Sequence, residues 1–409
     1  MADDNKPDHR RIGQELDLFT FSDLVGSGLP LWTPRGTILR RQLDDFVQEM
    51  RDKVGFQEVT IPHLTKKDLY EASGHWSKFS EELFRIKSRE GHEFAVKPMN
   101  CPHHTQIYAS RPRSYRELPI RYRETTMDYR DEQTGELNGL ARTRSFTQDD
   151  AHVFCREEDI LQEFINLWEI IEKFYQTLNF ELSLRFSKRD PKESKGYAGS
   201  DEQWQLAEAE IQKALDKRGA QAADGTGDAA FYGPKLDFIA KDSLGRDWQV
   251  ATIQVDFAQP EGLKLTYTDE EGKEKRPVMI HCAVMGSIER FLAVYLEHSD
   301  AKFPLWLAPE QLRVATLNND EPVEKLAKEV VKKAKEQGLR ASLDDSNESV
   351  GKKIHDAEAM KVPYTVVIGG KELETGKVVP RSRSDLSEVG ETSIEVLLKK
   401  LSEDAKSRK

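Results

Sequence analysis

The sequence predicts an α+β protein, in which an antiparallel sheet flanked by helices is followed by a small mixed α/β domain. Two extended runs, about residues 119–130 and 142–154, flank the segment TGELNG, whose glycines suit a turn. They therefore predict a long antiparallel hairpin. Beyond residue 309, strand patterns alternate with helical ones, as in a mixed α/β domain. We expect two domains, residues 1–303 and 304–409, that meet at the segment FPLWLAP.

Composition narrows the class of protein. The chain of 409 residues is too long for one ordinary core, and its 33% charged and 37% hydrophobic residues are typical of a globular protein rather than a membrane or disordered one. A net charge of −11 argues against non-specific binding along nucleic acid, although it allows a local basic site for one folded RNA. Three widely spaced cysteines disfavour a disulfide scaffold. Without an apolar leader or spanning run, we expect a cytoplasmic location and no membrane contact.

Periodicity places the elements of the first domain. A helix is predicted from about residue 38 to Gly55, followed by a strand over residues 56–61 that ends at Pro62. The same reasoning predicts further helices over residues 8–18, 157–178, 201–217 and from about 288, and strands over residues 93–97, 180–186, 235–241, 247–257 and 278–283. The segment 219–228, rich in glycine and alanine, is predicted to be a loop.

The second domain is predicted to contain strands over residues 311–317, 339–343, 363–369 and 376–382, and helices over residues 322–337, 349–360 and 392–404. Its segment GKELETGKV, residues 370–378, resembles a phosphate-binding loop. It has one residue too many between its glycines and a valine where a magnesium-binding hydroxyl is required, so we interpret it as a hairpin turn. Phosphate would then be held by arginines, of which Arg130, Arg142 and Arg290 are the candidates.

The stretch RTRSFTQDDAHVFC, residues 142–155, is the most informative one in the chain. In an extended strand its even-numbered residues share one face: Arg142, Arg144, Phe146, Gln148, Asp150 and His152. At ~3.3 Å per residue this row spans roughly 33 Å, enough for a nucleotide with an amino acid beside it. Taken alone, the stretch fits the solvated face of an ordinary antiparallel strand better.

Cys101, His152 and His281 each lie on or next to a predicted strand, although they are far apart in the sequence. If they converge, one thiolate and two imidazoles would leave an open position on a zinc ion, as in catalytic rather than structural zinc sites. From the residues alone, a buried thiol and two hydrogen-bonded histidines is the simpler interpretation.

Four segments in this order add a specific resemblance: MNCP (99–102), YRDEQTG (129–135), RTRSFTQDDAHVFC (142–155) and MIHCAVMGSIERF (279–291). Together they resemble the catalytic core of the threonyl-tRNA synthetases, a family of class II aminoacyl-tRNA synthetases. The resemblance runs from residue 8 to about residue 405. It implies the class II antiparallel sheet, a C-terminal anticodon-binding domain and a homodimer. Cys282 departs from the family, since many members have arginine after the zinc-binding histidine.

Residue by residue, the resemblance implies one Zn²⁺ per chain held by Cys101, His152 and His281, which reverses the simpler interpretation. It implies contacts with ATP, which would bind together with Mg²⁺, from Arg130, Glu132, Arg142, Phe146, Gln249, Thr252 and Arg290. It implies contacts with the amino acid from Met99, Gln148, Asp150, Tyr232 and Gln254, and catalytic roles for Arg130, Lys235 and Arg290. It implies contacts with the tRNA anticodon from Asn347, Glu372 and Arg381. Gln249 and Gln254 are an odd number of residues apart, so a regular strand would point them to opposite faces. A bulge is therefore needed to aim both into one cleft.

The implied activity is ATP-dependent ligation of L-threonine to its tRNA through a threonyl adenylate. An open zinc site beside Asp150 would reject valine, which lacks the hydroxyl group. Serine lacks only a methyl group, worth roughly 1–3 kcal/mol, so without an editing domain in this chain we expect serine mischarging. Two alternatives stay open: a catalytically idle paralogue that binds RNA or a partner, and a class II synthetase for a neighbouring amino acid such as serine or proline.

Overall fold

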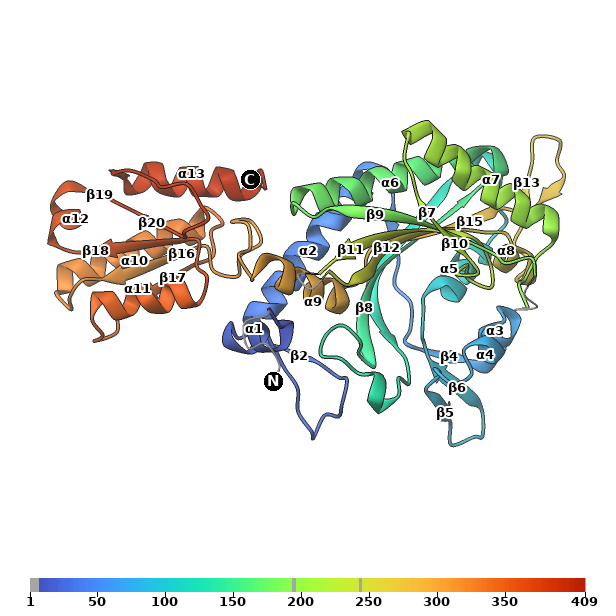
Figure 1. Ribbon diagram of the computed structural model, residues 1–409, viewed down its shortest axis with the longest axis horizontal. Helices are drawn as coiled ribbons and strands as arrows, with labels where there is room; N and C mark the ends of the chain where they lie inside the picture. The colour runs from blue at the N-terminus through green and yellow to red at the C-terminus, as the bar shows by residue number, and fades with distance from the viewer. Residues whose placement is uncertain (1–6, 193–195, 243–244, 409) are drawn as a thin grey trace. The chain divides into compact units, whose positions relative to one another are not determined.

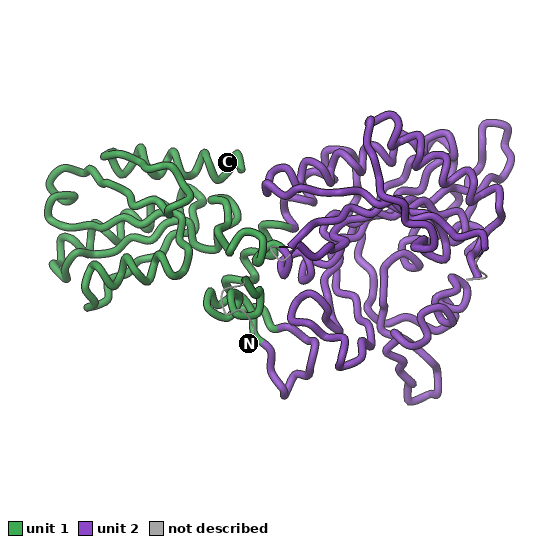
Figure 2. Tube along the Cα trace, viewed as in Figure 1, with its two compact units in different colours: residues 1–20, 31–43, 295–409 green, residues 21–30, 44–294 purple. Residues whose placement is uncertain are grey.

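The structure, a computed structural model, describes residues 7–192, 196–242 and 245–408. Figure 2 shows two compact units. The first unit contains the chain up to Thr20, residues 31–43 and the chain from Tyr295 onward. The second unit contains residues 21–30 and 44–294. The chain alternates between the two units over its first 44 residues. The predicted boundary between residues 303 and 304 stays a prediction. Among the described residues, no helix is both long and apolar enough to cross a membrane.

A large sheet organises the second unit (Figure 1). Its strand order in the described residues is β10-β9-β11-β12-β15-β8-β7-β3. The strands are β3 (Gln57–Glu58), β7 (Ile120–Tyr129), β8 (Ser145–Cys155), β9 (Leu182–Lys188), β10 (Ala223–Thr226), β11 (Lys235–Lys241), β12 (Asp247–Asp256) and β15 (Val278–Ser287). The two edge pairings, β10 with β9 and β3 with β7, are parallel, and the pairings between them are antiparallel. The predicted antiparallel sheet and its β7–β8 hairpin are therefore confirmed.

Helices cover both faces of this sheet. In Figure 1, α6 (Ile160–Thr177) and α7 (Asp201–Arg218) run along one face, and α6 packs against β12 and β15. The apolar side of α6 is buried, and Trp168 meets Phe238 of β11 edge-on. On the other face lies α5 (Cys101–Ala109), where Tyr108 stacks on Phe154 with ring centroids 4.6 Å apart. The site described below lies on the α5 face.

Smaller elements complete this unit. A three-stranded sheet consists of β4 (Leu64–Lys66), β6 (Glu93–Val96) and β5 (Arg85–Lys87). Near it lie α3 (Lys67–Ala72) and α4 (His75–Lys78); α8 (Ala258–Gly262) and the hairpin of β13 (Tyr267–Thr268) and β14 (Glu274–Lys275) follow β12. The helices α2 (Pro34–Lys53) and α9 (Ile288–Ser299) each contain residues of both units.

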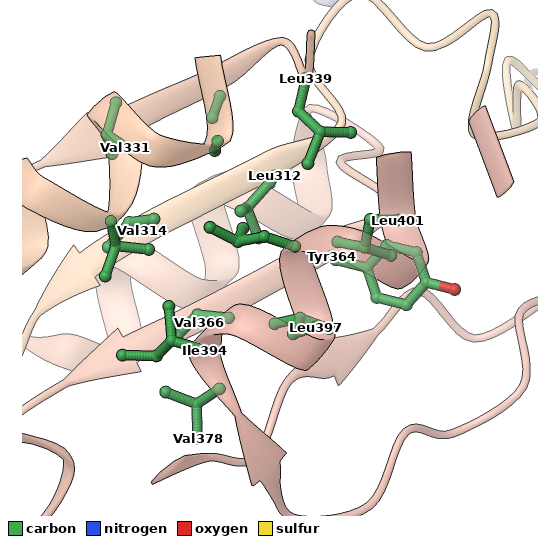
Figure 3. Close-up of a cluster of buried hydrophobic side chains, with 14 of the residues drawn as sticks. Leu312, Val314, Val331, Leu339, Tyr364, Val366, Val378, Ile394, Leu397 and Leu401 are labelled. Carbon is green, nitrogen blue, oxygen red and sulfur yellow. The ribbon is translucent and has the colours of Figure 1, made fainter. Parts of the chain in front are cut away.

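The first unit contains α1 (His9–Glu15), the pair β1 (Phe19–Thr20) and β2 (Leu31–Trp32), and the C-terminal α/β domain. That domain has a sheet of order β17-β16-β18-β20, with β16 (Leu312–Thr316), β17 (Ala341–Asp344) and β18 (Tyr364–Ile368) parallel and β20 (Arg381–Ser382) antiparallel. Its helices are α10 (Glu321–Glu336), α11 (Val350–Ala359), α12 (Gly370–Thr375) and α13 (Ile394–Lys406). Figure 3 shows Val314 and Val366 of the strands with Leu397 of α13 in one buried apolar cluster. The predicted mixed α/β domain is confirmed.

Several local predictions are wrong. The strand β8 begins at Ser145, so Arg142 and Arg144 precede it and are not part of its face. The predicted loop 219–228 contains β10, a sequence of low strand propensity that pairs with β9 through tertiary contact. The predicted hairpin turn at residues 370–378 is largely the helix α12, which Gly376 ends in a left-handed conformation with φ of 63°. The predicted strand 376–382 divides into β19 (Lys377–Val378) and β20, which lie in different sheets.

Candidate active site

The structure brings Cys101, His152 and His281 together. All three are buried, and their ligand atoms lie within 4.8 Å of one another. The two histidines face each other across the β8–β15 pairing, with His152 Nε2 3.1 Å from His281 Nδ1, and Cys101 is the first residue of α5. Two imidazole nitrogens and one thiol suit zinc and leave coordination open for a guest. The chemistry of the donor set therefore fits the predicted ion.

The remaining ring nitrogens of the two histidines also have partners. His281 Nε2 lies 2.9 Å from Asp256 Oδ2, and His152 Nδ1 lies 2.8 Å from His104 Nδ1. Such outer partners fix the tautomer and ring orientation of metal-binding histidines. Burial raises the pKa of the Cys101 thiol, with a weaker opposing effect of a hydrogen bond from Gln259, and burial lowers the pKa of His152.

The predicted amino-acid residues surround this trio. Tyr232 stacks on His281 with ring centroids 5.1 Å apart, and its hydroxyl donates to Gln254 Oε1 over 2.9 Å. Gln254 lies opposite His281 in the β12–β15 pairing. Asp150 Oδ1 is 3.7 Å from His152 Nε2, and burial raises the pKa of this carboxyl. Met99 is buried in the apolar cluster that contains Cys101 and Tyr108.

The bulge predicted in β12 is confirmed. Phe238 of β11 lies opposite Ala251, but Ile239 lies opposite Gln249, so Val250 is the extra residue. After this insertion Gln249, Thr252 and Gln254 are all half-buried, whereas Ala251, Ile253 and Val255 are buried. The bulge thus resolves the parity conflict between the two glutamines.

A buried carboxylate links two of the predicted ATP contacts, Gln249 and Thr252, to the predicted catalytic lysine. Asp237 Oδ1 accepts hydrogen bonds from Gln249 Nε2 over 2.8 Å and from Thr252 Oγ1 over 3.1 Å. Its other oxygen, Oδ2, lies 2.9 Å from Lys235 Nζ and accepts from Ser187 Oγ over 2.7 Å. Sequence reasoning missed Asp237, although a carboxylate inside a buried strand is itself a signal.

A cavity of about 270 Å³ lies beside this network. Its lining includes every predicted nucleotide residue: Arg130, Glu132, Arg142, Phe146, Gln249, Thr252 and Arg290, together with Gln148. The Arg130 guanidinium lies over the Phe146 ring, 5.1 Å from its centroid. Burial lowers the pKa of Arg290, and the positive charges of Arg130 and Arg142 lower it further. Three cations around one cavity favour an anionic guest such as a polyphosphate.

Sequence reasoning also missed His75, at the start of α4. Its side chain is fully buried, with Nδ1 2.8 Å from Ser73 Oγ and its ring 6.4 Å from that of Tyr232. Its Nε2 has no hydrogen-bond partner among the described residues. The dipeptide His75-Trp76 follows a glycine in the positive-φ region, but no local spacing connects it with the distant trio.

The predicted anticodon residues lie in the first unit on separate elements. Asn347 precedes α11 and accepts a hydrogen bond from the Asn319 side chain, and Glu372 of α12 accepts from the Gly369 backbone N–H over 3.0 Å. Arg381 is exposed on β20. These are surface positions that a polynucleotide could contact.

Comparisons with known proteins agree with this architecture. Residues 84–299 match the tRNA synthetase class II core domain (G, H, P, S and T), and residues 311–404 match an anticodon binding domain. The chain belongs to the class II tRNA synthetases.

Within that class, curated relatives that match nearly the whole chain include threonine-tRNA ligases. That of Parabacteroides distasonis is 46% identical over 388 residues, which are 94% of this chain and 59% of that protein. That of Phocaeicola vulgatus is 45% identical over 407 residues, 99% of this chain and 62% of that protein. The chain thus spans about three fifths of the length of these curated relatives. A crystal structure of the RNA binding domain of threonyl-tRNA synthetase from Cryptosporidium parvum superimposes with a TM-score of 0.91 at 38% identity, covering 97% of this chain and 98% of that one.

Proposed function

We propose that this chain ligates L-threonine to its tRNA in two steps, through a threonyl adenylate. The observation that carries the proposal is the convergence of Cys101, His152 and His281 beside Asp150, next to a cavity lined by arginines. The first group forms a receptor for an amino acid with a hydroxyl group, and the second forms a receptor for a nucleotide polyphosphate. When bound, Zn²⁺ would offer its open coordination to the amino nitrogen and hydroxyl of the amino acid.

The protein residues would supply position and charge rather than a nucleophile. The carboxylate of threonine attacks the α-phosphorus of ATP, and pyrophosphate leaves. Arg130, Arg142 and Arg290 line the cavity that would hold the phosphates, where fixed positive charge stabilises the pentavalent transition state together with the Mg²⁺ of ATP. Lys235, held by Asp237, would lie near the reacting carboxylate. In the second step a ribose hydroxyl of the tRNA attacks the acyl carbon, and AMP leaves.

Selection for threonine would depend on Asp150. This buried carboxylate can accept the hydroxyl proton of threonine, and valine has the same shape but offers no donor. Binding valine would leave the carboxylate without its partner, at a cost of about 1–3 kcal/mol. Serine retains the hydroxyl, so the site should distinguish it less strongly.

Amino-acid-dependent exchange of pyrophosphate into ATP tests the activity. We expect strong exchange with threonine, weaker exchange with serine and almost none with valine. Equal rates with valine would contradict the role of Asp150, and faster exchange with serine or proline would favour a synthetase for that amino acid. Binding of tRNA without any exchange would favour an idle paralogue.

Elemental analysis tests the metal. We expect one zinc per chain in the purified protein and loss of zinc in Cys101→Ser. Cys155 is equally buried and lies outside the trio, so Cys155→Ser is the matched control and should keep its zinc. The proposal also includes a homodimer and contacts with the tRNA anticodon from Asn347, Glu372 and Arg381.

A further inference from the structure

The carboxylate that contacts His281 is itself held by a neighbouring side chain. Asp256 is the last residue of β12, and Gln259 lies one turn later in α8. The Gln259 backbone N–H donates to Asp256 Oδ1 over 2.9 Å, and Gln259 Nε2 donates to Asp256 Oδ2 over 2.9 Å. His281 Nε2 lies 2.9 Å from the same Oδ2. The carboxylate is therefore fixed from both sides before any ion binds.

The Gln259 side chain contacts Asp256. Its Nε2 donates to Asp256 Oδ2, whereas its Oε1 has no hydrogen-bond partner among the described residues. A buried oxygen without a partner costs about 1–3 kcal/mol, so this side chain is not explained by stability alone.

Because these groups are buried, their hydrogen bonds are the main determinant of the orientation of the His281 ring. The exposed fraction is 0% for Asp256, 2% for Gln259 and 5% for His281, so bulk water competes little for these groups. An Nε2–H group of His281 that donates to Asp256 leaves the lone pair of Nδ1 facing Cys101 and His152. The other tautomer would present a proton to the position of the ion.

We propose that Asp256 and Gln259 form a positioning pair that sets the metal affinity of the Cys101, His152 and His281 centre. Asp256 selects the His281 tautomer, and Gln259 fixes Asp256. The inference rests on the proposed function, because it assumes that the trio holds a cation. It adds residues to which neither the resemblance nor the comparisons assign a role.

Cobalt titration of the full chain, stripped of metal, tests the pair. Co²⁺ gives a thiolate charge-transfer band when Cys101 binds it, and competition with a chelator gives the affinities for Co²⁺ and Zn²⁺. Gln259→Met keeps the length of the side chain and removes the amide. We expect its affinity to fall about 10- to 100-fold, the usual effect of losing an outer partner, with an altered cobalt band. Asp256→Asn should weaken binding at least as much, since the amide no longer selects one tautomer.

Gln212→Met is the matched control, because Gln212 is an exposed residue of α7 whose amide also donates to an aspartate, Asp216. It should bind both ions as the unchanged chain does. Wild-type affinity and an unaltered band in both Gln259→Met and Asp256→Asn would overturn the inference. If Gln259→Met fails to fold, as judged by circular dichroism, the isosteric Asp256→Asn decides the test. Absence of a cobalt band in the unchanged chain would instead overturn the metal centre of the proposed function.

Discussion

Single residues define the chemistry of this chain more clearly than any element does. The side chains that share one face of β8 could be taken from the sequence because side chains alternate along a strand: Phe146, Gln148, Asp150 and His152 follow one another on that face. Their individual roles are implied by the family resemblance. Asp237, His75, Asp256 and Gln259 could not be found in this way. Asp237, His75 and Asp256 contact segments farther along the chain, and Gln259 acts through Asp256, so no local spacing connects these residues with the site.

At the residue scale, His75 gives a prediction on pH. Burial, aided by the charges of His281 and Arg130, lowers the pKa of His75 from 6.5 to about 3. Between these values the unfolded chain binds a proton that the folded chain does not, so stability is retained above the unfolded pKa and falls as pH decreases. The variant His75→Phe fits the aromatic surroundings and has no titratable ring, so this contribution of residue 75 to the pH dependence of stability should disappear. The advantage in unfolding free energy of the unchanged chain over the variant should shrink by about 1.4 kcal/mol from pH 7.5 to pH 5.5.

Urea unfolding at both pH values measures this difference. His355→Phe, a change of an exposed histidine in α11, is the matched control. An advantage of the unchanged chain over His75→Phe that stays constant between the two pH values would show that burial does not keep this imidazole neutral.

At the element scale, the position where β15 leaves β8 connects the trio of Cys101, His152 and His281 with the arginine-lined cavity. The register between the two strands breaks between Ala283 and Ser287. Asp149 of β8 closes this break, since its carboxylate accepts the backbone N–H groups of Val284 over 2.8 Å and Met285 over 2.9 Å. The break begins two residues after His281 and leads into α9, the helix that carries Arg290.

Arg51 of α2 holds this junction, and we expect its loss to be costly. It is fully buried, and its Nη2 donates to the Asp149 carbonyl oxygen over 2.9 Å and lies 3.2 Å from Asp149 Oδ2. Arg51→Leu should lower the unfolding free energy by about 3–5 kcal/mol, because it leaves a buried carboxylate without its cation. Lys53→Leu, on the exposed side of the same helix, should change it by less than about 0.5 kcal/mol. Urea unfolding followed by fluorescence measures both.

The same guanidinium lies 3.4 Å from the carbonyl oxygen of Cys282, the position where many family members carry arginine. A double change, Arg51→Leu with Cys282→Arg, should therefore recover part of the lost stability. Equal stability of the single and double variants would show that an arginine at 282 cannot reach Asp149.

Gly286 gives a second prediction for this junction. It lines the nucleotide cavity with φ of 67°, and a Cβ there would lie 3.1 Å from the Val250 carbonyl oxygen. Gly286→Ala should cost about 1–2 kcal/mol of stability through its left-handed backbone and should raise the KM for ATP in pyrophosphate exchange. Gly338→Ala is the matched control, since Gly338 has φ of 86° but no atom within 4 Å of the added Cβ. An unchanged KM in Gly286→Ala would argue against nucleotide binding in this cavity.

At the scale of the whole molecule, the two compact units should separate activation of threonine from recognition of tRNA. Arg381→Ala in the C-terminal domain should reduce kcat/KM for tRNA in aminoacylation about tenfold or more, the usual effect of losing a charged hydrogen bond. It should leave pyrophosphate exchange unchanged, because Arg381 belongs to the other unit from the exchange site. Lys399→Ala, an exposed cation on α13, is the control. A parallel fall in exchange would contradict this division of labour.

The sequence by itself determined the kind and order of most elements, the hairpin that carries the site and the side chains that share a face of β8. All of these depend on local periodicity, which neighbouring residues fix among themselves. The need for a bulge in β12 followed from the family resemblance together with the alternation of side chains along a strand. Only the tertiary structure decided that His152 and His281, 129 residues apart, meet each other and Cys101, that Asp237 joins Lys235 to Gln249, and that residues 223–226 form a strand. Burial and contact between distant segments depend on how the whole sheet packs, and no local pattern contains that information.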